Sequence, residues 1–219
     1  MDDNEWLASM SPTKPDWEYH EICLWLPHKP ETVEDIANDM VANGFRLDRA
    51  IATYEGSILD GRHRYEAALK SGAEPIFVEF QGSVVDAIAY VTSENVARRH
   101  LSNREKEYFY AQRAGALGVR KREDSLKQNS SDVQNCTTVP SQQEHAESIG
   151  VHTQTVKNWE KDRKEIISDP ELEEKAKTPA GYQEAKKEVQ KRRKATKEEA
   201  NRIAKLKSLG ERSAAESSN

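Results

Sequence analysis

Residues 58–68, ILDGRHRYEAA, are the stretch that decides the predicted fold of this chain. The apolar start predicts a short strand, Gly61 predicts a tight turn, and the residues after it predict a helix. That helix would begin with Arg62, His63 and Arg64, although cations gain nothing from the dipole at a helix N-terminus. A turn that binds phosphate explains them, because a helix N-terminus presents unpaired N–H groups to an anion. A solvated helix start with surface arginines would give the same pattern.

Short strands and helices alternate around this stretch. The hydrophobic pattern predicts buried strands over 22–26, 50–54 and 76–80, and helices over 32–43 and 83–95. Alternation in such short units indicates a small α/β or α+β domain.

The charge of the chain is unevenly distributed. The 219 residues carry a formal net charge of −5, but residues 1–96 hold 7 Lys+Arg and 18 Asp+Glu, whereas residues 97–219 hold 26 and 20. A basic half is typical of proteins that bind nucleic acid. Apolar stretches are far shorter than the roughly 20 residues that cross a bilayer. We therefore expect no membrane span. Cys23 and Cys136 are far apart in sequence, so we also expect no zinc finger and no disulfide scaffold. Together with the basic half, these observations predict a cytoplasmic, DNA-associated protein.

Three motifs in this order resemble those of the ParB/sulfiredoxin superfamily. The turn at 61–67 matches the GxRRxRA box, 33–44 resembles the element eLaxSIxexG, and ENVARRHL at 94–101 resembles the box ENxQRxxL. Residues 102–107 stand where the family places a helix with the pattern xxxEeA, so the resemblance covers about residues 20–115.

The sequence departs from the family at three positions. Arg62 stands where sulfiredoxins carry their catalytic cysteine, which excludes sulfiredoxin chemistry. Ala97 replaces the glutamine of the second box, and His63 replaces an arginine of the first.

The resemblance implies a domain that binds a nucleoside triphosphate, CTP first, together with Mg²⁺. The residues implied at the phosphates are Gly61, Arg62, His63, Arg64 and Arg98. Glu94 and Asn95 would supply oxygen ligands to Mg²⁺. A homodimer and a partition ATPase are the implied protein partners. CTP hydrolysis and nuclease activity both stay open, and in a nuclease Asp60, Glu66 or His63 would act as acid or base.

Residues 141–159, SQQEHAESIGVHTQTVKNW, fit the pattern of a helix-turn-helix. Ser141 with Glu144 predicts a capping box, and Gly150 predicts the turn. His145 stands where an apolar residue is usual, so we expect it to be partly exposed. The outward residues of the second helix would contact double-stranded DNA; they are His152, Thr153, Gln154, Thr155, Lys157, Asn158 and Lys161. A helical hairpin used only for packing is the alternative.

Residues 175–207 hold 12 Lys+Arg and 4 Glu, including the run KRRK at 191–194. Such a segment is either a solvated face or a surface that contacts DNA phosphates. Its apolar residues are too sparse to predict a coiled coil.

The expected fold is therefore an α/β (α+β) ParB/sulfiredoxin-like N-terminal domain, an all-α helix-turn-helix domain and a basic tail that is partly helical or disordered. The segments are a lead-in over 1–20, the nucleotide-binding domain over 21–101, a connecting helix over 102–119, a linker over 120–140, the helix-turn-helix over 141–168 and the tail over 169–219. We expect a nucleotide-regulated, sequence-specific DNA-binding protein that acts in partition of a plasmid or mobile replicon, or in gene regulation. A nuclease targeted to DNA and a transcription regulator without a nucleotide switch are the alternatives.

Overall fold

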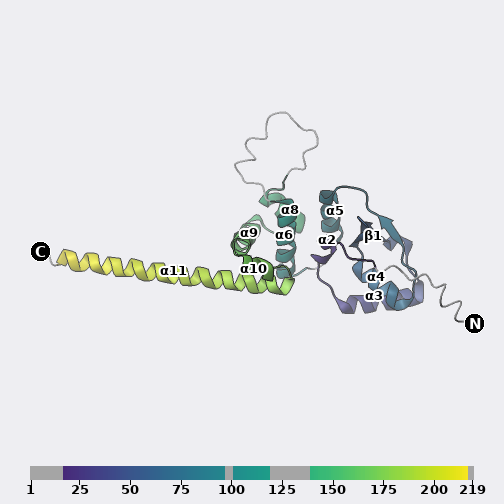
Figure 1. The fold of residues 1–219 in the computed structure, drawn as a ribbon, viewed down its shortest axis with the longest axis horizontal. Coiled ribbons are helices and arrows are strands. Elements are labelled where there is room, and N and C mark those ends of the chain that lie inside the picture. The colour runs from purple at the N-terminus through teal and green to yellow at the C-terminus, as the bar shows by residue number, and fades with distance from the viewer. Residues whose placement is uncertain (1–16, 97–100, 119–138, 217–219) are drawn as a thin grey trace, which may run out of the picture. The chain divides into compact units, whose positions relative to one another are not determined.

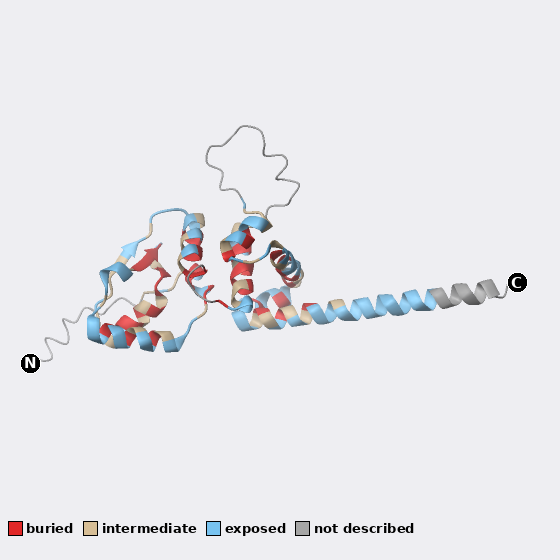
Figure 2. Ribbon diagram, turned by 180° about the vertical axis from the view of Figure 1, so that it is seen from behind, coloured by how far each residue is buried: buried red, intermediate tan, exposed pale blue. Residues whose placement is uncertain are grey.

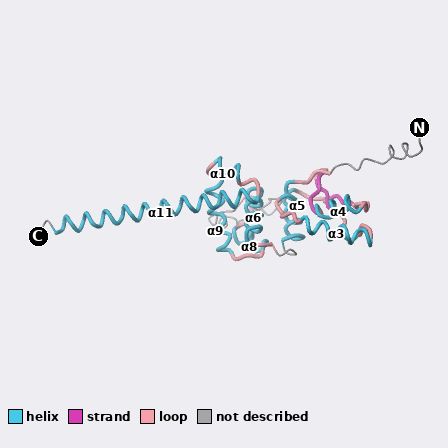
Figure 3. The backbone as a smooth tube through the Cα atoms, turned by 90° about the horizontal axis from the view of Figure 1, so that it is seen from below, coloured by secondary structure: helices cyan, strands magenta, loops and turns pink. Residues whose placement is uncertain are grey.

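The structure is a computed structural model that describes residues 17–96, 101–118 and 139–216, with side chains as far as Lys207. It is mostly helical with one three-stranded sheet (Figures 1 and 3). The chain forms two compact units that divide between Glu94 and Asn95.

The sheet of the first unit is built around a hairpin. Strands β1 (Ile51–Tyr54) and β2 (Ser57–Asp60) pair antiparallel, and β3 (Phe77–Glu79) pairs parallel to β1, which gives the order β2-β1-β3. Both residues of the turn, Glu55 and Gly56, have positive φ, as a type I′ hairpin turn requires. All three strands lie where the sequence predicts them, over 50–54, at the apolar residues before Gly61, and over 76–80.

Helices cover this sheet and carry most of the core of the first unit. α3 (Pro30–Asn43) packs on α4 (Arg62–Ser71), and Ala67 and Ala68 are fully buried between them, so their small side chains let the helices approach closely. α5 (Val84–Val91) begins at a capping box and continues into a π-helical turn, η2 (Thr92–Val96). A 3₁₀ turn, η1 (Leu47–Arg49), precedes β1.

The strand predicted over 22–26 is wrong, because the first element of the structure is a short helix, α2 (Glu21–Leu24). The His20 side chain caps it by accepting a hydrogen bond from the Ile22 N–H at 3.3 Å. Ile22 and Cys23 are buried all the same. An apolar run of this length has the same appearance in a buried strand and in a buried helical turn.

The described part of the second unit is built from helices. Its elements are α6 (Asn103–Leu117), α8 (Gln142–Ile149), α9 (Thr153–Ile167), α10 (Pro170–Lys175) and α11 (Pro179–Glu216). One core joins α6, α9, α10 and the first turns of α11, and it includes Tyr108, Ile166, Leu172, Tyr182 and Val189. The segment from residue 169, expected as a basic tail, therefore begins as part of a folded core.

The two halves of α11 differ in burial (Figure 2). Tyr182 and Val189 are each 2% exposed, whereas Ile203 is 46% exposed and Leu206 is 60% exposed. The first half of α11 belongs to the packed unit, and the second half extends beyond it. Within the described ranges, no helix has both the length and the apolar character that crossing a membrane would need.

Candidate functional site

The turn between β2 and α4 is built on Gly61. This residue is the N-cap of α4, has a φ of 103°, and offers no side chain to cap the helix. A Cβ at Gly61 would lie 3.0 Å from Nη2 of Arg64, tighter than ordinary contacts. The turn therefore needs glycine for its backbone conformation, a side chain there would require the Arg64 guanidinium to shift, and the N-terminus of α4 has no side-chain cap.

Arg62 turns toward the segment that precedes α3. Its Nη2 donates a hydrogen bond to the Leu26 carbonyl oxygen at 3.1 Å, and its guanidinium lies 5.9 Å from the ring centre of Tyr19. Its Nε is buried and has no acceptor in the described structure. A buried N–H donor without an acceptor is costly, so this atom would be stabilised by an anionic oxygen.

His63 is a structural residue in this conformation. Its side chain is buried, and Nε2 accepts a hydrogen bond from the Lys29 backbone N–H at 3.0 Å. The ring also stacks on His28 with 5.0 Å between ring centres. Because Nε2 is the acceptor of a backbone N–H, it does not offer a lone pair to a reacting group.

The other two candidate acid–base groups are also engaged. Asp60 Oδ2 accepts a hydrogen bond from Arg64 Nη2 at 2.7 Å. Glu66 accepts one from the Tyr19 hydroxyl at 3.0 Å and lies 2.7 Å from His28 Nε2. In this arrangement both carboxylates hold α4 in place.

Arg64 faces a pocket of about 220 Å³ that also contains Arg46 and Arg49. Arg64 Nη1 donates to the Arg49 carbonyl oxygen at 2.9 Å. Asp39 is the one acidic residue among the described residues that line this pocket, beside three arginines. Arg46 and Arg49 also lie near Asp48, at 2.9 and 3.8 Å, in exposed ion pairs.

Arg46 and Arg49 line the same pocket as Arg64 but belong to none of the motifs that predict the site. Cations are rare in the acidic half of the chain, with 7 Lys+Arg in residues 1–96, and four of these fall between 46 and 64. That concentration is the sequence signal that could have placed them beside Arg64.

Glu94 and Asn95, the two residues implied as Mg²⁺ ligands, both lie in η2, where Glu94 is partly exposed and Asn95 is 2% exposed. Arg98 lies outside the described residues. Among the residues that the structure describes, no cluster of three His, Cys, Asp or Glu side chains could hold a metal ion.

In the second unit, α8 and α9 are joined by a tight turn at Gly150, which has a φ of 68°. Ser141 and Glu144 form a capping box at the start of α8. His152 is the N-cap of α9, and its Nδ1 accepts a hydrogen bond from the Gln154 N–H at 3.1 Å. The helix bounds and the turn lie where the sequence predicts them.

Between residues 152 and 161, the exposed side chains at the start of α9 are polar or basic, and none of them is acidic. His152, Gln154, Lys157, Asn158 and Lys161 are exposed, while Thr153 and Thr155 are half-buried. Gln154 Nε2 donates to Asn158 Oδ1 at 3.3 Å, so the two amide side chains lie next to each other. Neither Lys157 nor Lys161 has an acidic partner within the part of the chain that the structure describes.

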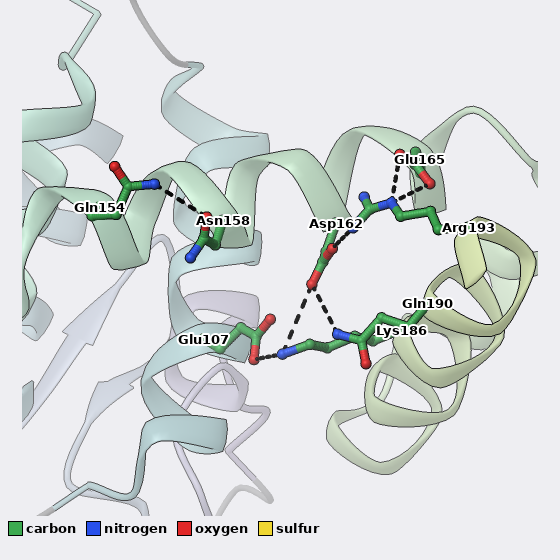
Figure 4. A network of polar contacts seen from close by, with 8 residues as sticks. All are labelled: Glu107, Gln154, Asn158, Asp162, Glu165, Lys186, Gln190 and Arg193. Carbon is green, nitrogen blue, oxygen red and sulfur yellow. Dashed lines mark hydrogen bonds and ion pairs between the residues drawn. The ribbon is translucent and has the colours of Figure 1, made fainter. Parts of the chain in front are cut away.

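Two of the three acidic residues of α9, Glu160 and Asp162, are buried on its packed side, and the third, Glu165, is half-exposed and paired with Arg193. Glu160 is 2% exposed and accepts hydrogen bonds from Arg163 Nε and from the Tyr110 hydroxyl, both at 2.8 Å. Burial by itself would raise the pKa of Glu160, but these hydrogen bonds lower it overall. Asp162 and Glu165 both bind Arg193 (Figure 4).

His145 is buried, contrary to the expectation of partial exposure. It is 0% exposed and packs edge-on against the Tyr110 ring, with 5.4 Å between ring centres. A polar residue is tolerated at this apolar position because both ring nitrogens have partners, Arg113 Nη1 at 2.8 Å and the Gly118 carbonyl oxygen at 3.0 Å.

Half of the KRRK run is structural. Arg192 Nη1 binds Asp169 at 2.7 Å, and Arg193 Nη1 binds Asp162 at 2.5 Å. These ion pairs attach α11 to the segment that carries α9 and α10. Lys191 and Lys194 are exposed.

Comparison with known proteins gives only distant similarity. No protein-family model and no curated protein matches the chain. Among solved structures it is similar to the C-terminally truncated chromosome-partitioning protein ParB from Caulobacter crescentus complexed to the centromeric parS site, with 15% identity, a TM-score of 0.36, and coverage of 74% of this chain and 70% of that chain. The same Caulobacter protein complexed with CTP-gamma-S gives 17% identity, a TM-score of 0.30, and coverage of 74% and 77%. Scores this low do not assign the chain to a family.

Proposed function

We propose that this chain is a ParB-like, sequence-specific DNA-binding protein whose helix α9 enters the major groove. The observation that carries this proposal is the separation of charge on α9. Its three acidic residues are all paired with arginines, two of them buried, and the exposed side chains between residues 152 and 161 are His152, two amides and two lysines. A DNA duplex repels carboxylates and attracts cations, so this face suits it.

The proposed roles follow from side-chain chemistry. Gln154 and Asn158 lie one turn apart, and an amide can pair with both hydrogen-bonding positions that adenine presents in the major groove. Lys157 and Lys161 are suited to guanine or to phosphate oxygens. His152, Thr153 and Thr155 lie in the first turn, where helix N-termini approach the DNA backbone.

We propose further that the first unit binds the phosphates of a nucleoside triphosphate beside Arg64. The uncapped N-terminus of α4 and the pocket that Arg64 shares with Arg46 and Arg49 support an anion site. The sequence resemblance favours CTP. Glu94 would be a protein oxygen ligand for a Mg²⁺ ion that neutralises phosphate charge. Asn95 would be the second oxygen ligand, supplied from the buried side of the same turn.

Under this proposal, the nucleotide controls how two copies of the first unit engage each other and so how long the protein stays on DNA. A homodimer and a partition ATPase would be the protein partners, and the task would be partition of a mobile replicon or regulation of its genes.

DNA binding is tested by selecting duplexes from a pool with a randomised core, using the full chain. We expect one sequence motif to be enriched. The double variant Gln154→Ala/Asn158→Ala should lose that motif, because it removes the two amides proposed to contact bases. Both side chains are exposed, so the variant should still fold. The control is Gln143→Ala on α8, which removes an exposed amide that donates a hydrogen bond to Glu147 and leaves the charge unchanged. Enrichment of no motif by the wild type would contradict the proposal.

Nucleotide binding is tested by titrating CTP, ATP, GTP and UTP with Mg²⁺, with and without DNA. We expect Arg46→Gln/Arg49→Gln to weaken binding at least tenfold, because two cations leave the phosphate pocket. The control is Lys70→Gln, an exposed cation in the same unit that pairs with Glu34. If the wild type selects a DNA motif but binds no triphosphate, the chain is a transcription regulator without a nucleotide switch.

Incubating supercoiled plasmid with Mg²⁺ separates binding from a nuclease. Cleavage abolished by His63→Ala in a folded variant would favour the enzyme. We expect no such cleavage, because Nε2 of His63 already accepts the Lys29 N–H.

A further inference from the structure

The second unit contains a polar pocket that none of the proposed sites uses. Its volume is about 350 Å³, and it lies where α6, α9 and α11 meet. Arg104 comes from the first turn of α6, Thr155 from α9, and Lys186 and Lys187 from α11. Three cations from two helices therefore converge on one pocket.

Two of these cations are free to bind a ligand. Arg104 and Lys187 are exposed, and neither has an acidic partner within the described structure. Lys186 is held at the wall, with its Nζ 2.6 Å from Glu107 Oε2 and 3.9 Å from Asp162 Oδ2 (Figure 4). The available charge at the mouth of the pocket is positive.

Hydrogen-bond donors also line this pocket. Nε2 of Gln183 is buried and has no acceptor in the described structure, and the Thr155 hydroxyl and Gln190 amide belong to the same lining. A buried donor without a partner gains most from a charged acceptor. A phosphate group offers several acceptor oxygens and no fixed donor.

Glu107 is the one acidic residue among the described residues of the lining, and it opposes an anion. It is 2% exposed; Oε2 is bound by Lys186, while Oε1 has no partner. The charged side chains of the lining still sum to a net positive charge. This residue gives the proposal a test of opposite sign, because its neutralisation should strengthen anion binding.

The position of the pocket indicates which phosphate it would take. Thr155 and Trp159 line it from α9, and they directly follow Gln154 and Asn158 in sequence, the two amides of the exposed face. A helix in the major groove is flanked by the phosphates of the groove edges, and contacts to them fix its register.

We propose that this pocket binds a phosphodiester of the DNA backbone through Arg104, Lys187 and Gln183, and so sets the position of α9 on the duplex. The inference rests on the proposed DNA binding. A free phosphate or a mononucleotide shares this chemistry, so the experiment must separate the two sources.

The test measures affinity of the full chain for a 30-base-pair duplex carrying the selected motif, over a series of salt concentrations. Arg104→Gln/Lys187→Gln should lower affinity roughly three- to tenfold, equally for motif and mixed-sequence duplexes, and should reduce the slope of log K against log salt by about 1. Glu107→Gln should raise affinity and leave motif preference unchanged. The charge-matched control, Lys197→Gln/Lys207→Gln, removes two exposed lysines of α11 outside the pocket and should change affinity less than twofold.

Four outcomes would contradict the proposed phosphodiester site. If the pocket and control variants weaken binding equally, only overall charge matters and the site is overturned. If inorganic phosphate or CMP saturates the pocket without DNA, and Arg104→Gln/Lys187→Gln abolishes that binding while duplex affinity is unchanged, the DNA assignment is overturned. If Gln154→Ala/Asn158→Ala loses the motif while the pocket variant binds DNA as tightly as the wild type does, the proposed function stands and the phosphodiester site fails. If the wild type binds no duplex, both the proposed function and the phosphodiester site fail. Thermal unfolding of every variant identifies any that do not fold.

Discussion

Arg113 Nη1 lies 2.8 Å from Nδ1 of His145 and fixes the state of that buried ring. A guanidinium only donates hydrogen bonds, so Nδ1 must be the acceptor. Nε2, 3.0 Å from the Gly118 carbonyl oxygen, must then carry the proton. The ring is therefore neutral and fully partnered, and this interaction joins α6 to α8.

Stability should fall in mild acid because of His145. Burial lowers the pKa of His145 to about 4 from the ordinary 6.5, with the Arg113 charge acting in the same direction. Between these two values the unfolded chain binds a proton that the folded chain does not, so the free energy of unfolding decreases as the pH falls from about 6.5 to 4. The full shift corresponds to roughly 3 kcal/mol. Urea unfolding at intervals of half a pH unit measures the slope.

His145→Gln supplies the control, because an amide can accept from Arg113 and donate to Gly118 but does not titrate. The variant should lose this part of the pH dependence. His152→Gln, at an exposed cap, should keep it. An unchanged slope in His145→Gln would show that other groups cause the acid sensitivity.

Patterns with strong local signals were predictable from sequence. The turn at Gly61 and the capping box at Ser141 depend on the backbone preferences of one or a few residues, so they appear at the expected positions. The run at 22–26 carried no such signal, because its apolar residues are buried either way and the helix is decided by the His20 cap. Burial of His145 depends on Arg113, 32 residues away, and no local pattern reveals it.

The first half of α11 should contribute to stability and the second half should not. Val189 is 2% exposed within the core of the second unit, and Ile203 is 46% exposed. Val189→Ala should lower the free energy of unfolding by about 1–2 kcal/mol, since it leaves a space in a packed core. Ile203→Ala should change it by less than about 0.5 kcal/mol. Equal effects in chemical unfolding would mean that α11 does not pack as described.

Loss of the hydroxyl group should change the free energy of unfolding differently at two buried tyrosines of this core. The Tyr108 hydroxyl donates to the Lys177 carbonyl oxygen at 2.8 Å, whereas the Tyr182 hydroxyl is buried without a partner in the described structure. Tyr108→Phe should cost about 1 kcal/mol, and Tyr182→Phe should be neutral or stabilising. Thermal and urea unfolding of the two variants provide the comparison, each serving as the control for the other. Equal losses would indicate a hydrogen bond at Tyr182.

Sequence motifs located the turn of the candidate phosphate site but not the shape of the site. Successive residues on a helix point in different directions, so Arg62 turns toward Leu26, His63 is buried near Lys29, and Arg64 faces the pocket. The pocket is completed by Arg46 and Arg49, which precede β1. Their proximity to Arg64 is a consequence of the tertiary fold, not of spacing along the chain.

Gly61→Ala should be more damaging than Gly56→Ala, although both glycines have positive φ. Gly56 has a φ of 76° with nothing within 4 Å of an added Cβ, so its replacement costs only backbone strain, about 1 kcal/mol. At Gly61, with a φ of 103°, the added Cβ would also press on the Arg64 guanidinium, which is held by Asp60 and by the Arg49 carbonyl. We expect a loss of about 2 kcal/mol or more, together with weakened triphosphate binding if Arg64 belongs to that site. Urea unfolding and the nucleotide titration, run on both variants, measure the two effects separately. Equal unfolding losses would show that Arg64 moves aside freely and that the space at Gly61 is not required.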